Sequence, residues 1–130
     1  MFALDTNTLI YYFKGMGRVA ARLAGCAPSE IGIPIVVVYE LETVIAKSQQ
    51  PRKRREQLDA LLVSTRILPF DRAAARHSAT LRASLEATGT PLGPLDCLIA
   101  GIALAYRTHL VTRKSTEFGR VAGLSVVDWY

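Results

Sequence analysis

The sequence has few of the residues that build disulfide scaffolds or zinc sites. Its 130 residues include two cysteines, Cys26 and Cys97, and two histidines. Two cysteines are too few for a disulfide framework, and their spacing matches no zinc motif. Any metal site in this chain would therefore have to use oxygen ligands, which are carboxylates above all.

Long hydrophobic runs are also missing. The longest apolar stretches extend from Ile31 to Tyr39 and from Leu98 to Tyr106. Both are far shorter than the roughly 20 residues that a membrane-spanning helix needs, so we interpret them as buried elements. The chain starts with a strand pattern at Phe2–Leu4 and has no basic stretch ahead of it, which argues against a signal peptide. We expect a cytoplasmic protein that makes no membrane contact.

The composition is that of a packed domain. Half of the residues are apolar and 21% are charged, and a chain of this length has room for one hydrophobic core. We therefore expect a single domain, residues 1–130. The net charge is +5, with a basic block at Arg52–Arg55. Such a block attracts polyanions such as nucleic acid, although it could equally be the solvated face of a helix.

Strand patterns alternate with helical patterns along the chain. We predict strands at 2–4, 31–37, 66–69, 109–112 and 124–127, and helices at 8–14, 18–23, 39–48, 52–62, 72–88 and 95–106. Alternation of this kind predicts an α/β fold with a parallel sheet and helices on both of its faces. In such sheets ligands bind outside the carboxyl ends of the strands.

Several of the eleven acidic residues stand near predicted strand ends. Asp5 directly follows the first strand, Glu40 lies soon after the second, and Thr112 ends the fourth with Glu117 a few residues beyond. Asp96 opens the apolar helix 95–106. Because parallel strands end at one edge of the sheet, we expect these residues to meet there.

Each of these acids also has a purely structural explanation. Asp5 could cap the following helix, Asp96 could complement a helix dipole, and Glu40 could be an exposed helix residue. Asp5 and Asp96 are nevertheless embedded in apolar sequence, and burial of several like charges is costly unless a cation compensates them. The absence of a His or Cys set favours Mg²⁺ or Mn²⁺.

In order, these segments resemble the PIN-domain ribonucleases, and most of all the VapC toxins of bacterial type II toxin–antitoxin systems. The similarity covers the whole chain. No single motif is specific, but the ordered set is. It rests on the segments Phe2–Asn7, Tyr39–Leu41, Gly93–Asp96 with Ile99-Ala100, Leu110–Thr112 with Glu117-Phe118, and Gly123-Leu124 to Asp128-Trp129.

The resemblance implies a PIN-like three-layer sandwich with a parallel five-stranded sheet in the order 3-2-1-4-5. It implies that Asp5, Glu40 and Asp96 hold Mg²⁺ or Mn²⁺ for the hydrolysis of RNA phosphodiester bonds. By the same similarity Thr112 would orient a carboxylate or a water near the metal, and Glu117 would be the candidate for a fourth acid.

The resemblance also implies partners for the protein. VapC-like toxins form homodimers and are held inactive by a VapB-like antitoxin, whose C-terminal segment occupies the cleft. We expect an apolar groove for it beside the active edge, flanked by Tyr11, Tyr12, Val37, Val38 and Leu41.

One position departs from the family pattern. Two residues after the Val-Thr pair many relatives have Asn or Asp, whereas this chain has Lys114. A cation here could weaken metal binding, replace a water network or contact the substrate phosphate. We predict that without metal its ammonium group contacts an acidic side chain. Because of Lys114, an alternative interpretation is a catalytically impaired PIN domain that serves as a protein-binding module.

Two other classes of protein share parts of the pattern. A receiver-like signalling domain has a similar length and a Lys after a late strand, but it needs paired acids after the first strand, where Asp5 is followed by Thr6. A haloacid-dehalogenase-type phosphatase needs Asp in place of Asn7.

Overall fold

The protein forms a five-stranded parallel sheet with the strand order β3-β2-β1-β4-β5, in a computed structural model that describes residues 1–130. The strands are β1 (Phe2–Leu4), β2 (Ile31–Pro34), β3 (Arg66–Leu68), β4 (His109–Val111) and β5 (Ser125–Val127). The helices are α1 (Thr6–Phe13), α2 (Val19–Ala24), α3 (Ile35–Ala46), α4 (Pro51–Ser64), α5 (Arg72–Ala87), α6 (Pro94–Ala105) and α7 (Ser115–Phe118), with a short 3-10 turn at Pro28–Glu30. The predicted fold class and strand order are confirmed.

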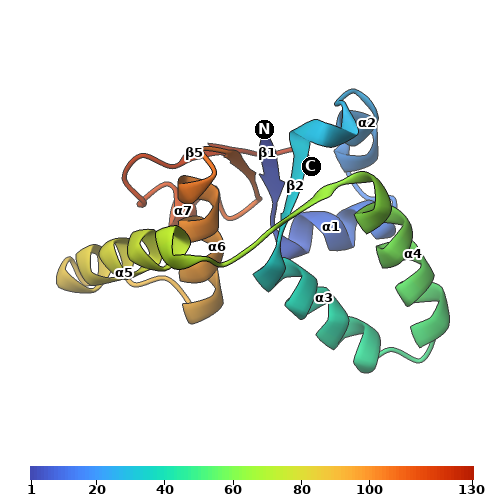
Figure 1. Cartoon of the computed structure of the whole chain (residues 1–130), viewed down its shortest axis with the longest axis horizontal. Helices are drawn as coiled ribbons and strands as arrows, with labels where there is room; N and C mark the ends of the chain where they lie inside the picture. Colours follow the sequence, from blue (N-terminus) through green and yellow to red (C-terminus); the bar gives the residue numbers. More distant parts are fainter.

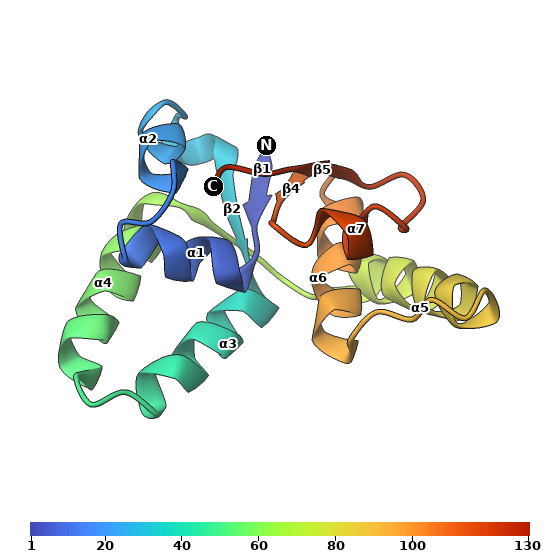
Figure 2. The ribbon, with the colours of Figure 1, turned by 180° about the vertical axis from the view of Figure 1, so that it is seen from behind.

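The helices cover the sheet in two layers. Figure 1 shows α1–α4 on one side of the strands and α5–α7 on the other, and the view from behind in Figure 2 agrees. The first two crossovers move along the sheet from β1 to β3, whereas the third returns past β1 to β4. Right-handed crossovers in opposite directions place their helices on opposite faces, which gives three layers.

Strand β1 is the centre of the sheet and of the core. Ala3 pairs with Gly32 of β2 on one side and with Leu110 of β4 on the other. Ala3 and Leu4 have no exposed surface, and Ala100 and Ala103 of α6 are equally buried. The interpretation of the apolar stretch from Leu98 as a buried element is thereby confirmed for α6. No helix in the fold combines the length and the apolar character needed to cross a membrane.

The boundary between the second strand and the next helix differs from the prediction. The stretch 31–37 was expected to be one strand, but β2 ends at Pro34 and α3 begins at Ile35. Proline has no N–H to continue the strand ladder, and Val37 is fully buried as a helix residue. A short apolar run fits a buried helix as well as a strand, and packing overrides the β preference of valine. The other predicted elements lie within two residues of the observed bounds, whereas α7 was not predicted.

Helices α5 and α6 approach each other closely at Gly101. A Cβ atom on this residue would overlap the hydroxyl of Ser78 and would lie 2.8 Å from the carbonyl oxygen of Ala74. We expect Gly101→Ala to lower the free energy of unfolding by about 1–3 kcal/mol, as overpacked cores do. Urea unfolding measures this change. Gly25→Ala is the control, because its Cβ would meet only ordinary contacts, and equal stability of the two variants would contradict the prediction.

Candidate metal site and the adjoining groove

Asp5 is a carboxylate buried at the junction of β1 and α1. It is 4% exposed, and its Oδ1 accepts a hydrogen bond from the backbone N–H of Thr8 at 2.9 Å. The cap that was considered as a structural explanation is therefore present. Burial raises the pKa of Asp5, and this effect outweighs the opposing hydrogen bonds from Thr112 and Thr8 and the charge of Lys114. Ionised Asp5 is thus destabilised in the folded protein unless more positive charge is supplied.

Glu40 and Asp96 reach the same place from two other helices. Glu40 lies in the second turn of α3, later in the helix than the sequence suggested, and its Oε1 accepts a hydrogen bond from the hydroxyl of Thr6 at 2.6 Å. Asp96 lies in the first turn of α6, and its Oδ2 is 3.1 Å from the ammonium nitrogen of Lys114. A cavity of about 50 Å³ is lined by Asp5, Thr6, Asn7, Glu40, Asp96, Ile99 and Lys114.

Thr112 and Lys114 follow β4 at this edge. Thr112 is fully buried, and its hydroxyl accepts a hydrogen bond from the backbone N–H of Lys114 at 2.9 Å. Although burial, the largest influence, lowers the pKa of Lys114, the hydrogen bond to Asp96 and the charges of Asp96, Asp5 and Glu40 together raise it. Lys114 is therefore a firmly protonated cation among the carboxylates.

The fourth predicted acid, Glu117, lies away from the other three. Glu117 lies on α7 with an exposed side chain, and it does not line the cavity. Two polar lining residues that were not singled out as site residues are Thr6 and Asn7. Their signal in the sequence is their position directly after Asp5, which brings them to the same strand end.

The donor set suits a hard divalent ion in chemical kind, because it consists of carboxylate oxygens without histidine or cysteine. The side chains do not form a ready ligand shell, since no three His, Cys, Asp or Glu groups come close enough together to hold a metal. Asp5, Glu40 and Asp96 are each held by a hydrogen-bond donor of the protein instead. A metal bound here would therefore have to take the place of such partners, of which Lys114 is the charged one.

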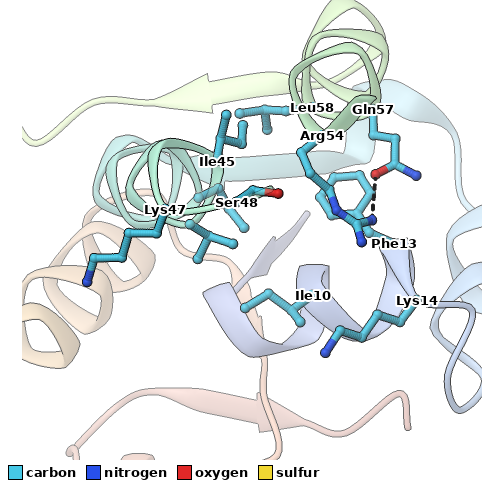
Figure 3. A pocket seen from close by; sticks show the side chains of 11 residues that line it. Ile10, Phe13, Lys14, Ile45, Lys47, Ser48, Arg54, Gln57 and Leu58 are labelled. Carbon is cyan, nitrogen blue, oxygen red and sulfur yellow. Dashed lines mark hydrogen bonds between the residues drawn. The ribbon is translucent and has the colours of Figure 1, made fainter. Parts of the chain in front are cut away.

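A larger groove lies between α1, α3 and α4. It has a volume of about 450 Å³, and Figure 3 shows side chains from all three helices around it. Its apolar lining is Ile10, Phe13, Leu41, Val44, Ile45 and Leu58, and its cations are Lys14, Lys47 and Arg54. Of the five residues that were expected to flank an apolar groove, only Leu41 lines this one. The others lie elsewhere, with Val37 buried in the core and Tyr11 against Tyr130.

A shallower depression connects the groove with the acidic cavity. Thr6, Asn7 and Glu40 line both this depression and the cavity, whereas Ile10 and Val44 line both the depression and the groove. The acidic cavity and the basic, apolar groove are therefore parts of one continuous surface along α1 and α3.

This architecture matches a known family. The model of the PIN domain matches residues 2–124, so the chain belongs to the PIN-domain family. The receiver-like alternative is wrong, because receiver sheets have the order 2-1-3-4-5, whereas this sheet has the order 3-2-1-4-5.

The similar proteins place the chain in the VapC branch of that family. The tRNA(fMet)-specific endonuclease VapC of Shigella flexneri is 34% identical over 128 residues, which cover 98% of this chain and 97% of the relative. The DNA-bound VapBC structure from Salmonella typhimurium has a chain with TM-score 0.92 and 32% identity, and the match covers 99% of this chain and 98% of that one. VapBC2 from Rickettsia felis, crystallised with a promoter DNA fragment, has the same TM-score at 30% identity and the same coverage.

The burial of Asp5 predicts a pH-dependent effect of Asp5→Asn on stability. Asparagine keeps the helix cap without the buried charge, so at neutral pH and without metal the variant should have the higher Tm, by about 4 °C for each kcal/mol of desolvation cost removed. Because the pKa of Asp5 is raised in the folded state, the wild type loses stability as pH rises from below 3.8 through the folded pKa. The advantage of the variant should therefore shrink as pH falls through this range.

Thermal unfolding in a chelating buffer, followed by circular dichroism from neutral to acidic pH, measures this difference. Asp59→Asn is the matched control, because Asp59 is exposed on α4. A lower Tm for Asp5→Asn at neutral pH would contradict the prediction.

Proposed function

We propose that this chain is the toxin of a VapBC-type toxin–antitoxin system, a Mg²⁺- or Mn²⁺-dependent endoribonuclease that acts as a cytoplasmic homodimer. The observation that carries the proposal is the meeting of Asp5, Glu40 and Asp96 from three separate elements in one cavity at the carboxyl edge of the sheet. The names of the relatives support ribonuclease activity, and the Shigella relative is named for tRNA(fMet). We therefore take tRNA(fMet) as the first substrate to test.

The residues of the cavity have distinct tasks in this proposal. A bound divalent ion would activate a water for in-line attack on the phosphodiester and would neutralise developing charge. Asp5, Glu40 and Asp96 would hold that ion. Thr112 would help to orient Asp5 through the hydrogen bond from its hydroxyl group, which also lowers the pKa of that carboxylate. Glu117 remains a candidate fourth acid, and in this structure it lies outside the cavity.

The groove suits the C-terminal segment of a VapB-like antitoxin. Six apolar side chains would bury apolar residues of such a segment, and three cations would pair with acidic ones. The depression shared with the acidic cavity would allow the segment to continue over Glu40. Inhibition would then follow from steric exclusion of RNA from the catalytic edge.

The catalytic proposal predicts that Asp5→Asn and Asp96→Asn lower the rate of RNA cleavage by several orders of magnitude. Each substitution removes a carboxylate on which the metal, and with it the nucleophile and the charge stabilisation, depends. Cleavage of tRNA(fMet) and of total RNA, with Mg²⁺ or Mn²⁺ and with a chelator, is the measurement. Circular dichroism should show that both variants remain folded.

Asp59→Asn makes the same chemical change at an exposed position on α4 and should keep the wild-type rate. A wild-type rate in either cavity variant would show that the site is misassigned. If the wild type itself cleaves no RNA in any metal, the alternative of a catalytically impaired PIN domain that binds other proteins takes the place of the enzyme.

The partner proposal predicts that Val44→Asp impairs neutralisation by the antitoxin while RNA cleavage is kept. Val44 lines the groove and is 44% exposed, so the fold tolerates the change, but a buried carboxylate in the complex is costly. The measurement is growth of cells that express the chain with or without the antitoxin encoded beside it. Val63→Asp is the matched control, because Val63 is 88% exposed and does not line the groove.

Wild-type protein and Val63→Asp should arrest growth when they are expressed without the antitoxin, and the antitoxin should restore growth. Val44→Asp should arrest growth with or without the antitoxin. Full rescue of Val44→Asp would place the antitoxin elsewhere. Harmless expression of folded wild-type protein would count against a toxin.

A further inference from the structure

We propose that Lys114 is an internal counter-ion of the acidic cavity, which competes with the divalent cation for Asp96 and thereby weakens metal binding. This inference rests on the proposed metal-dependent function and extends it to a residue that the catalytic scheme does not use. It starts from an ion pair, with the ammonium nitrogen of Lys114 at 3.1 Å from Oδ2 of Asp96.

The backbone of Lys114 is fixed at the cavity. Its N–H donates to the hydroxyl of Thr112, which has no exposed surface. Lys114 follows β4 closely, and β4 pairs directly with β1, which carries Asp5 at its end. The side chain of Lys114 therefore starts beside the carboxylates, and its contact with Asp96 is a product of the fold rather than a chance meeting of two surface residues.

The cavity leaves little room for a divalent ion beside the ammonium group. With the Lys114 side chain in place its free volume is about 50 Å³, which corresponds to roughly one or two water molecules. Magnesium ions keep several of their waters when they bind to proteins. A partly hydrated divalent ion at Asp96 would therefore crowd the ammonium group, and like charges at such a distance also repel.

The charges of the lining residues also predict competition between Lys114 and a divalent ion. Among the seven lining residues Lys114 is the one cation, and Asp5, Glu40 and Asp96 are the three carboxylates. Without metal, Lys114 offsets part of this negative charge. Its side chain is 41% exposed, so the ammonium group can turn away into solvent when a metal enters, without any change of the fold.

The experiment measures Mn²⁺ affinity by titration calorimetry on the full chain, after removal of metal with a chelator. Lys114→Met removes the charge and adds no oxygen ligand, and it should bind Mn²⁺ roughly two- to fivefold more tightly than wild type, because exposed ion pairs of this kind are worth up to about 1 kcal/mol. Lys114→Arg keeps the charge and should stay within about twofold of wild type. Lys53→Met removes the same charge from an exposed position on α4 and should change nothing.

A second measurement uses thermal unfolding of the same proteins. Without metal, Lys114→Met should have a lower Tm than wild type, because the carboxylates have lost their cation, and saturating Mn²⁺ should raise its Tm by more than it raises that of wild type. The difference in Mn²⁺ affinity should also narrow at high salt, since a half-exposed ion pair is screened.

The outcomes separate this inference from the proposed function. Equal or weaker Mn²⁺ binding by folded Lys114→Met, with clear binding by wild type, overturns the competition and leaves the metal-dependent enzyme standing. Tighter binding by Lys53→Met to the same degree would trace the effect to net charge and would also overturn it. Absence of Mn²⁺ binding in wild type and in all variants overturns both the inference and the proposed function.

Discussion

Burial of the Asp5 carboxylate at the end of the central strand is the constraint on which the rest of the acidic edge depends. Because β1 lies between β2 and β4, a residue directly after β1 is surrounded by the segments that follow β2 and β4. The carboxylate is partly stabilised by the cap of α1 and by Thr112, but burial still raises its pKa. The charge of Lys114 offsets only part of the remaining cost, so ionised Asp5 would be stabilised further by additional positive charge.

The alternation of strand and helical patterns predicted the α/β class with a parallel sheet, and the resemblance to the PIN-domain family implied the strand order. Asp71 caps α5, with its Oδ1 accepting a hydrogen bond from Ala74 N–H at 2.9 Å. The error at Ile35 has a physical origin, since a β-branched apolar run is compatible with both a strand and a buried helix. Only the packing of α3 against the rest of the core decides between them, and packing is not visible in local sequence.

The site was predicted to the extent that backbone topology determines it. Asp5, Glu40 and Asp96 meet because β1 and β2 end, and α3 and α6 begin, at one edge of the sheet, and Lys114 contacts an acid as expected. Side-chain direction is not determined in this way. Glu117 points to solvent from a short helix that was not predicted, and the groove is lined by positions such as Val44 rather than by the tyrosines of α1.

The surface along α3 joins two opposite charges, and this has a consequence for an anionic chain such as RNA. The cations Lys14, Lys47 and Arg54 attract phosphate groups to the groove, but the carboxylates of the adjoining cavity repel them. In the proposed function a metal ion in the cavity would offset this repulsion, because the one ammonium group of Lys114 does not neutralise three carboxylates. A divalent ion supplies twice that charge. In the same proposal an acidic antitoxin segment would pair with the cations of the groove without any metal, whereas the binding of RNA would gain from a metal ion in the cavity.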